Sequence, residues 1–164
     1  MSDLIPEYKF CLNDNLDDSF LPTQGEPNAT GWDVRSTIDL YLNPGDHFKI
    51  PLGFSVFSPK GWWLQLHPRS SSFVKRQMNN LIGIIDEDYS NEVMFAGQYL
   101  PNYANSDVLA IKCGDRIGQL IPVKRQVMKV TKVTKDEFDN LCKQRSSVRA
   151  GGFGSTDFLC KKVH

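Results

Sequence analysis

Three consecutive acidic residues, at positions 86–88, follow an apolar run at residues 81–85 and are closed by Tyr89. A carboxylate beside apolar side chains can be desolvated enough to act as a general base, and Asp86 is the acid that adjoins this run. The aromatic ring that follows could pack on a cyclic ligand. A solvated acidic turn would have the same composition, so this stretch alone leaves both interpretations open.

A second candidate is Arg69, which three serines follow at residues 70–72. An arginine fork, small hydroxyl donors and accessible backbone N–H groups can together hold a polyphosphate without a large net charge. If a helix begins here, those N–H groups lie at its positive end, which favours an anion further. A serine-rich helix cap would look the same, so a purely structural role is the alternative.

Near the C-terminus, Phe153 is a lone aromatic residue with glycines on both sides. No core could be built from such a stretch, but it suits a flexible arm that closes on a ligand. Phe153 would then stack on a planar group, while Arg149 and the polar groups of residues 154–156 would meet anions. The lysine of a P-loop is missing, which excludes that motif. A disordered tail is the other interpretation.

Short segments rich in strand-forming residues, separated by turns, surround these candidates. They lie at residues 29–36, 48–57, 62–67, 107–112, 116–123 and 127–133. Their lengths and spacing favour an all-β sandwich or barrel. The first of them carries Asp33, which is either an ordinary acid at a strand edge or a carboxylate directed at a ligand. The last alternates apolar and polar side chains, which predicts a half-exposed strand.

Two further elements are expected around the acidic residues and after the last strand. Residues 81–85 and 92–95 predict a β-hairpin whose tip carries the acids and the aromatic ring. Thr134 and Glu137 have the spacing of a capping box, so one short helix is predicted at about residues 134–143. Apart from it, only a turn or two of helix is expected, just after the serines.

The composition argues against several classes of protein. The 19 basic and 19 acidic residues balance, so no large positive field favours nucleic acid. Four widely spaced cysteines, without a CxxC pair or a Cys/His cluster, argue against a zinc site and for reduced thiols. Neither a signal peptide nor an apolar run of membrane-spanning length is present, so we expect a cytoplasmic protein that binds neither membrane nor nucleic acid.

Four stretches, in this order and register, resemble the trimeric dUTPase (deoxyuridine triphosphate nucleotidohydrolase) family. They are residues 68–71, 83–89, 116–121 and 151–156. The resemblance runs from about Gly31 to Thr156. It implies a jelly-roll-like all-β barrel or sandwich that assembles as a homotrimer, with active sites shared between subunits. The implied reaction is the hydrolysis of dUTP to dUMP and pyrophosphate with Mg²⁺.

The resemblance also implies roles for individual residues. Asp86 would be the base that deprotonates the water attacking the α-phosphorus, and Asp33 would hold Mg²⁺ through water. The implied contacts to the phosphates are made by Arg69, Ser70, Ser71, Gln119, Arg149, Gly154, Ser155 and Thr156. The implied contacts to uracil and deoxyribose are made by Asn80, Gly83, Ile84, Ile85, Tyr89 and Phe153.

Part of the arm departs from the family's pattern. The arm arginine of the family would fall at Val148, whereas Arg149 lies one residue closer to the glycines. Arg145 is the alternative candidate for this role. We expect a single β domain at residues 1–143 and an arm at residues 144–164 that carries the glycine-rich motif.

Two other functions are left open by the sequence. A dUTPase-like protein could use its nucleotide state to switch its grip on a protein partner, through residues 124–148 or the tail after Thr156. A dCTP deaminase-related enzyme shares an Arg-Ser-Ser element, found here at residues 69–71. Such an enzyme, however, needs a different hairpin and a catalytic glutamate.

Overall fold

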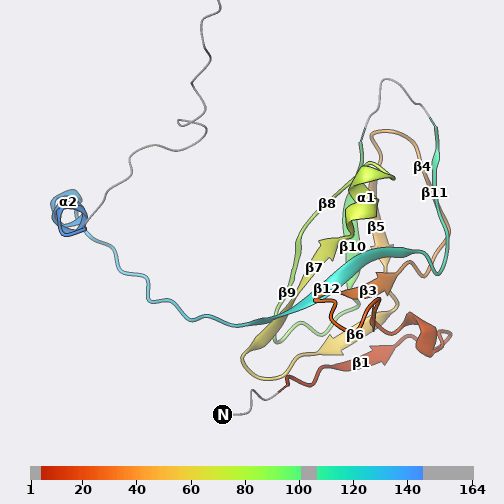
Figure 1. Ribbon diagram of the computed structural model, residues 1–164, viewed down its shortest axis with the longest axis horizontal. Helices are drawn as coiled ribbons and strands as arrows, with labels where there is room; N and C mark the ends of the chain where they lie inside the picture. Colours follow the sequence, from red (N-terminus) through yellow and green to blue (C-terminus); the bar gives the residue numbers. More distant parts are fainter. Residues whose placement is uncertain (1–4, 101–106, 146–164) are drawn as a thin grey trace, which may run out of the picture. The chain divides into compact units, whose positions relative to one another are not determined.

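The computed structural model describes residues 5–100 and 107–145 of the chain (Figure 1). By its internal contacts the chain divides into two compact units, residues 1–126 and residues 127–164. The β-strands lie in the first unit, and helix α2 (Lys135–Lys143) lies in the second. The expected boundary between a β domain and an arm stays a prediction.

Within the described residues, the first unit contains twelve strands and two short helical elements. The earlier strands are β1 (Lys9–Leu12), β2 (Thr23–Gln24), β3 (Trp32–Arg35), β4 (Leu40–Leu42), β5 (His47–Pro51) and β6 (Phe54–Phe57). The later strands are β7 (Trp62–Pro68), β8 (Met78–Asn80), β9 (Gly83–Ile85), β10 (Met94–Tyr99), β11 (Leu109–Ile111) and β12 (Arg116–Lys124). The helical elements are η1 (Asp18–Phe20) and α1 (Ser70–Val74), and α1 is the turn of helix expected after Arg69. No helix in the described ranges is both long and apolar enough to cross a membrane.

The described strands pair in antiparallel fashion and form four sheets. The largest has the order β2-β3-β12-β7-β9, and a second has the order β5-β10-β8. β1 pairs with β6, and β4 pairs with β11. Neighbouring strands are rarely consecutive in sequence, because the chain crosses repeatedly between sheets, as in a jelly roll. The prediction of a jelly-roll-like all-β fold is confirmed.

Aromatic rings pack among mainly aliphatic side chains in the core of the first unit. Phe95 stacks on Phe48 with ring centroids 6.2 Å apart, and Phe10 meets Phe54 edge-on at 5.3 Å. Burying a ring of this size contributes about 1.5–3 kcal/mol. Gly118 in β12 allows close packing, because a Cβ there would lie 2.8 Å from a ring carbon of Phe95. The core therefore fixes β12, on which part of the candidate site is built.

The hairpin predicted from residues 81–85 and 92–95 is wrong in its pairing. β8 pairs with β10, but the chain then leaves this pair, and β9 pairs with β7 in the five-stranded sheet. Ile85 is only 5% exposed there. Burying its side chain stabilises this arrangement by about 1.5–3 kcal/mol, which outweighs the local preference for a hairpin. The acidic loop, residues 86–93, consequently connects two different sheets.

The second unit confirms one prediction and corrects another. The N–H of Thr134 donates to the Glu137 carboxylate at 2.7 Å, and the Thr134 hydroxyl accepts from the Glu137 N–H at 3.3 Å. This is the expected capping box, and α2 follows it. The strand predicted at residues 127–133 is wrong, because this segment has no regular structure. Its valines recur at every third residue, which does not match the two-residue period of a strand.

Candidate active site

Asp33 is the centre of a charged cluster on the five-stranded sheet. One of its carboxylate oxygens lies 3.0 Å from Nε of Arg69, and the other lies 3.4 Å from a terminal nitrogen of Arg116. Asp33 is 7% exposed, whereas both arginine side chains are partly exposed. The buried carboxylate holds the two guanidinium groups in place and leaves one positive charge in excess. The cluster can therefore bind an anion at the surface.

Strand pairing and the start of α1 bring the phosphate candidates together. β12 pairs with β3 so that Gln119 lies opposite Asp33. β7 leads directly into α1, and Arg69 is the N-cap residue between them. Four of the predicted residues (Asp33, Arg69, Gln119 and Ser70) thus come from the three inner strands of one sheet and the helix that follows β7.

A buried hydroxyl fixes α1 against β12. Ser72 is 1% exposed, and its hydroxyl donates to the carbonyl of Ile117 at 2.8 Å. Ser70 is exposed and Ser71 is half-buried. The first-turn N–H groups of a helix have no partner within the helix, so these two residues present both N–H and hydroxyl donors. The segment can therefore donate several hydrogen bonds to a phosphate group.

Gly31 makes room for the side-chain amide of Gln119. A Cβ at Gly31 would lie 2.2 Å from Oε1 of Gln119, so any larger residue would displace the amide. The Nε2 of Gln119 donates to the carbonyl of Pro68 at 3.3 Å. The amide is thus held beside the turn that carries Arg69, where it can contact the same ligand.

The side chain of Asn80 has unsatisfied hydrogen-bonding groups. Both its Nδ2 and its Oδ1 are buried and have no hydrogen-bond partner among the described residues. Leaving such a group unpaired costs about 1–3 kcal/mol. β9 ends the five-stranded sheet, so backbone groups on one side of Gly83–Ile85 also have no partner among the described strands. A ligand with both donors and acceptors would satisfy groups of this kind.

Asp86 lines an open cavity of about 370 Å³. The lining residues are Trp63, Ile84, Asp86, Glu87, Asp88 and Arg125. The Asp86 side chain is exposed and makes no hydrogen bond or ion pair with the described residues. Ile84, which precedes it by two residues, is 66% exposed and supplies an apolar wall. The carboxylate is therefore free to accept a hydrogen bond from a ligand or water.

Tyr89 closes the loop that begins at Asp86. Its N–H donates to the Asp86 carbonyl at 3.2 Å, and its hydroxyl donates to the Glu92 carbonyl at 3.0 Å. Tyr89 remains 37% exposed. The loop thus fixes the ring while leaving part of it open to a ligand.

The candidate residues form two groups within one chain. The first contains the phosphate-binding candidates around Asp33. The second contains the candidates on β8, on β9 and in the loop with Asp86. Among the described residues, no hydrogen bond or ion pair joins the two groups. The predicted arm residues lie outside the described part of the chain: Arg149, Phe153, Gly154, Ser155 and Thr156.

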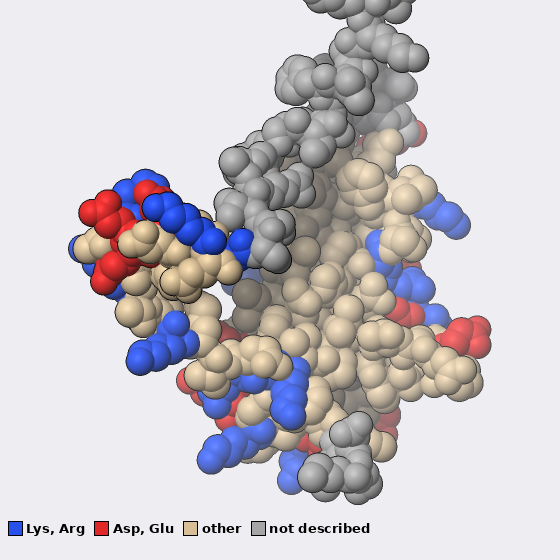
Figure 2. Space-filling model, turned by 60° about the vertical axis from the view of Figure 1, so that its left-hand side comes forward, with Lys and Arg blue, Asp and Glu red and all other residues tan. Residues whose placement is uncertain are grey.

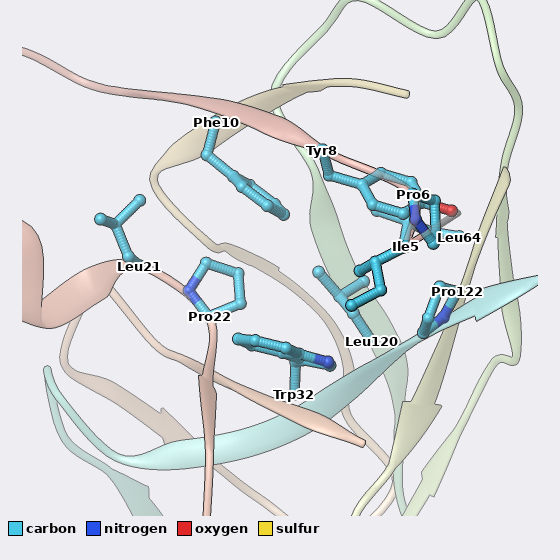
Figure 3. Close-up of a pocket in the computed structure, with 10 residues that line it drawn as sticks. All are labelled: Ile5, Pro6, Tyr8, Phe10, Leu21, Pro22, Trp32, Leu64, Leu120 and Pro122. Carbon is cyan, nitrogen blue, oxygen red and sulfur yellow. The ribbon is translucent and has the colours of Figure 1, made fainter. Parts of the chain in front are cut away.

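A separate apolar cavity of about 400 Å³ contains none of the predicted site residues. Figure 3 shows the rings of Tyr8 and Phe10, from the N-terminal segment, across this hollow from Trp32 of β3 and Pro122 of β12. The Tyr8 hydroxyl donates to the carbonyl of Trp63 at 3.2 Å, and burial raises the pKa of Tyr8 to about 12. The apolar lining of this cavity does not suit a polyphosphate.

Charged side chains of the two signs are interspersed on the face shown in Figure 2. No broad area of a single sign covers the described residues of that face. This agrees with the balanced composition of the sequence. With 19 basic and 19 acidic residues in balance, anion binding is expected from locally placed groups, such as the cluster around Asp33.

The structure adds two residues to those expected from the sequence. Arg116 pairs with Asp33, and Glu87 accepts a hydrogen bond from the N–H of Gly61 at 2.9 Å. Neither contact has a signal in the sequence, because each joins residues that only the strand pairing and the loop path bring together.

Comparisons with known proteins place the chain in a family. The family model described as dUTPase matches residues 17–157. A deoxyuridine 5'-triphosphate nucleotidohydrolase of Arabidopsis thaliana is 33% identical over 155 residues, covering 94% of this chain and 86% of that protein. The corresponding protein of Saccharomyces cerevisiae is 32% identical over 136 residues, covering 83% of this chain and 86% of its own length.

Solved structures agree on the fold. A mutant dUTPase of Staphylococcus bacteriophage 80alpha has a TM-score of 0.71 at 19% identity, covering 92% of this chain and 98% of that chain. The dUTPase of Streptococcus mutans has a TM-score of 0.65 at 18% identity, covering 74% of this chain and 98% of that chain. From the sequence matches, we conclude that the chain belongs to the dUTPase family.

Proposed function

We propose that this chain hydrolyses dUTP to dUMP and pyrophosphate, as a homotrimer whose active sites are shared between subunits. Family membership supports the reaction, and the similar plant and yeast proteins are named deoxyuridine 5'-triphosphate nucleotidohydrolases. The separation of the candidate residues into two groups within one chain is consistent with a site completed by another subunit.

The observation that carries the proposal is the unsatisfied amide of Asn80. Uracil presents acceptor, donor and acceptor groups along its pairing edge, and the amide together with the backbone of β9 could read them. Cytosine reverses part of that pattern and would leave buried groups unpaired, which is costly. A pocket closed tightly around the base at β9 would have no room for the 5-methyl group of thymine. Tyr89 would pack on the deoxyribose, where a 2′-hydroxyl would clash.

The proposed chemical step uses Asp86 as a general base. A water oxygen forms a bond to the α-phosphorus while the bond from that phosphorus to the α,β-bridging oxygen breaks. Pyrophosphate leaves, and the proton of the water passes to the Asp86 carboxylate. The exposed apolar side chain of Ile84 beside this carboxylate reduces its hydration when a nucleotide covers the site.

The phosphate-binding candidates around Asp33 would stabilise the negative charge that develops on the phosphates. Arg69 and the donors of Ser70 and Ser71 would neutralise the phosphate oxygens, and Gln119 would hydrogen-bond beside them. The arm from residue 144 onward would close over the nucleotide. There Phe153 would stack on the base, while Arg149 or Arg145, with residues 154–156, would meet the terminal phosphates.

The donor set around Asp33 fits Mg²⁺ held through water rather than directly. Both carboxylate oxygens already contact guanidinium groups, but a carboxylate has about four lone-pair sites, so each oxygen can still accept from water. Among the described residues, no group of three or more His, Cys, Asp or Glu side chains could hold a metal ion. The triphosphate would therefore supply the inner ligands. When bound, Mg²⁺ would orient the phosphates and neutralise their charge.

A nucleotide-dependent protein-binding switch is the second candidate function. Exposed apolar side chains of the second unit favour it, among them Val127, Met128, Phe138 and Leu141. These residues pack into no core within the described part of that unit. A partner protein would supply an apolar surface for them.

Pyrophosphate release from dUTP, dCTP, dTTP and UTP, with and without Mg²⁺, tests the proposal. We expect a strong preference for dUTP, dependence on Mg²⁺ and near-total loss of turnover in Asp86→Asn. Asp14→Asn changes an exposed acid elsewhere and should behave as wild type. Comparable turnover of dCTP or UTP would contradict the proposed base and sugar selection.

Removal of residues 149–164 tests the arm. The truncated protein should keep its oligomeric state in sedimentation but lose most of its turnover. Full activity of the truncated protein would exclude a closing arm.

A further inference from the structure

The side chain of Glu87 ties the loop that carries Asp86 to the rest of the β-sheet unit. Its Oε2 accepts from the N–H of Gly61 at 2.9 Å and lies 3.5 Å from a terminal nitrogen of Arg125. The backbone N–H of Arg125 in turn donates to the carbonyl of Gly61 at 2.8 Å. Glu87, the turn before β7 and the end of β12 therefore form one closed set of contacts.

We propose that Glu87 is a positioning residue for Asp86. Among residues 86–91, which are all described, only Glu87 has a side chain that makes a hydrogen bond or ion pair outside the loop. The other polar contacts of this stretch, those of Tyr89, stay within the loop. Asp86 is held on one side by Ile85 of β9, which pairs with Leu64 of β7, so losing Glu87 would free the chain on its other side. This inference rests on the proposed role of Asp86.

The hydrogen bond to Gly61, not the ion pair, is the main anchor. The ion pair is long at 3.5 Å, and the Arg125 side chain is 55% exposed, so water and salt screen it. Exposed pairs of this kind contribute about 0–1 kcal/mol. The N–H of Gly61 has a fixed direction, because it belongs to a tight turn in which Gly61 has φ of 81°. A glutamine at position 87 would keep an oxygen for this N–H, whereas an alanine would not.

The far end of the same loop supplies a matched control. Glu92 also accepts from a backbone N–H, that of Gly53 at 3.0 Å, and from Nδ2 of Asn13 at 3.0 Å. The chain there is already fixed, because Val93 makes two backbone hydrogen bonds, of 2.9 and 3.1 Å, with residues 52–54. The carboxylate of Glu92 is therefore redundant for the path of the loop.

Steady-state kinetics of the full-length oligomer with dUTP and Mg²⁺ test the proposal. Misplacing a reacting group by about 1 Å can cost about 100-fold in rate, so Glu87→Ala should lower kcat about 10- to 100-fold. KM should change little, since the proposed uracil and phosphate contacts do not include Glu87. Glu87→Gln should restore kcat to within about threefold of wild type. Glu92→Ala should keep its kcat.

The pH profile of kcat separates positioning from an effect of charge. If Glu87 acted only through its negative charge, the alanine and glutamine variants would lose rate equally and shift the acid limb by the same amount. Positioning instead predicts that Glu87→Ala lowers the plateau far more than Glu87→Gln, while any shift of the acid limb is the same in the two variants because both remove one charge. Equal losses in the two variants would overturn the proposal, as would wild-type kcat in Glu87→Ala.

Hydrogen exchange of the nucleotide-free protein gives a test that needs no turnover. Backbone amides of residues 86–91 should exchange faster in Glu87→Ala than in Glu87→Gln or Glu92→Ala, while the rest of β7 and β12 stays protected. Unchanged exchange in Glu87→Ala would overturn the proposal even if the enzyme hydrolyses dUTP. Absence of dUTP turnover in the wild type would instead contradict the proposed function. The exchange result would then still test whether Glu87 anchors the loop.

Discussion

Nε of Arg69 lies 3.0 Å from a carboxylate oxygen of Asp33, so the N-cap of α1 is linked directly to β3. Asp33→Asn would keep the shape of this side chain but remove the charge that also pairs with Arg116. We expect the free energy of unfolding to fall by about 1–3 kcal/mol, because two guanidinium groups lose their charged acceptor. Turnover of dUTP should fall as well. Thermal denaturation and pyrophosphate release measure the two effects.

Asp115→Asn is the control for this substitution. Asp115 pairs with Arg76 at 3.1 Å, but both side chains are about one-third exposed, at 30% and 31%. An exposed pair contributes about 0–1 kcal/mol, so the loss of stability should be smaller and turnover should be unchanged. If the two variants lose the same stability and both keep wild-type turnover, the cluster around Asp33 has no special role.

Gly31→Ala should impair activity more than stability. The added Cβ would meet Oε1 of Gln119 at 2.2 Å, and the amide would have to rotate away from the proposed phosphate site. Loss of one such hydrogen bond typically costs about 1–3 kcal/mol, which corresponds to a roughly 5- to 150-fold loss in kcat/KM. Gly25→Ala is the matched control, because its Cβ would lie 3.8 Å from the nearest atom, an oxygen of Asp33. Equal kcat/KM values for the two variants would argue against a role for Gln119.

Asn80→Ala should impair recognition of dUTP without lowering the stability of the protein. The wild-type amide is buried without partners in the described structure, so removing it should leave the nucleotide-free protein at least as stable. The same change should raise the KM for dUTP and reduce the preference for dUTP over dCTP. Calorimetry without nucleotide and competition kinetics give the two readouts. A clear loss of stability together with unchanged preference would show that Asn80 is a structural residue.

Local patterns predicted much of the fold, since strand-forming segments and turns lie where the all-β prediction put them. The capping box of Thr134 and Glu137 is also local, and the helix after it is confirmed. The two wrong predictions both concern which strand a segment pairs with. Residues 81–85 were expected to pair within a hairpin, but Ile85 gains more by burial against β7. Residues 127–133 contain strand-forming valines but lack a strand partner in the described chain, and side-chain pattern alone does not supply one.

In the candidate site, too, contacts between sequence neighbours were predictable and contacts made by strand pairing were not. Arg69 and residues 70–72 adjoin in sequence, so their joint role could be inferred without a structure. Their association with Asp33 and Gln119 depends on the register of β12 against β3, which no local signal determines. The contact of Glu87 with Gly61 depends likewise on where β9 leaves its sheet. Residue types therefore predicted what chemistry is available, and the strand pairing determined which groups act together.

Tyr8 should make the stability of the protein sensitive to alkaline pH. Burial raises its pKa in the folded state to about 12, whereas the ordinary value is 10.0. Below pH 10 the phenol is protonated in both states. Between pH 10 and about 12 the unfolded chain releases this proton while the folded chain keeps it, so the free energy of unfolding falls as the pH rises.

Tyr8→Phe tests this dependence by chemical denaturation across the same window. Below pH 10 the variant should be less stable by about 0.5–1.5 kcal/mol, because the hydrogen bond from Tyr8 to the carbonyl of Trp63 is lost. From pH 10 to about 12 the wild type should lose stability relative to the variant, since phenylalanine has no proton to release, so the variant's deficit should shrink and then reverse. Other tyrosines titrate in both proteins and cancel in the comparison. A difference that stays constant across this window would mean that Tyr8 titrates as an exposed phenol in the folded protein.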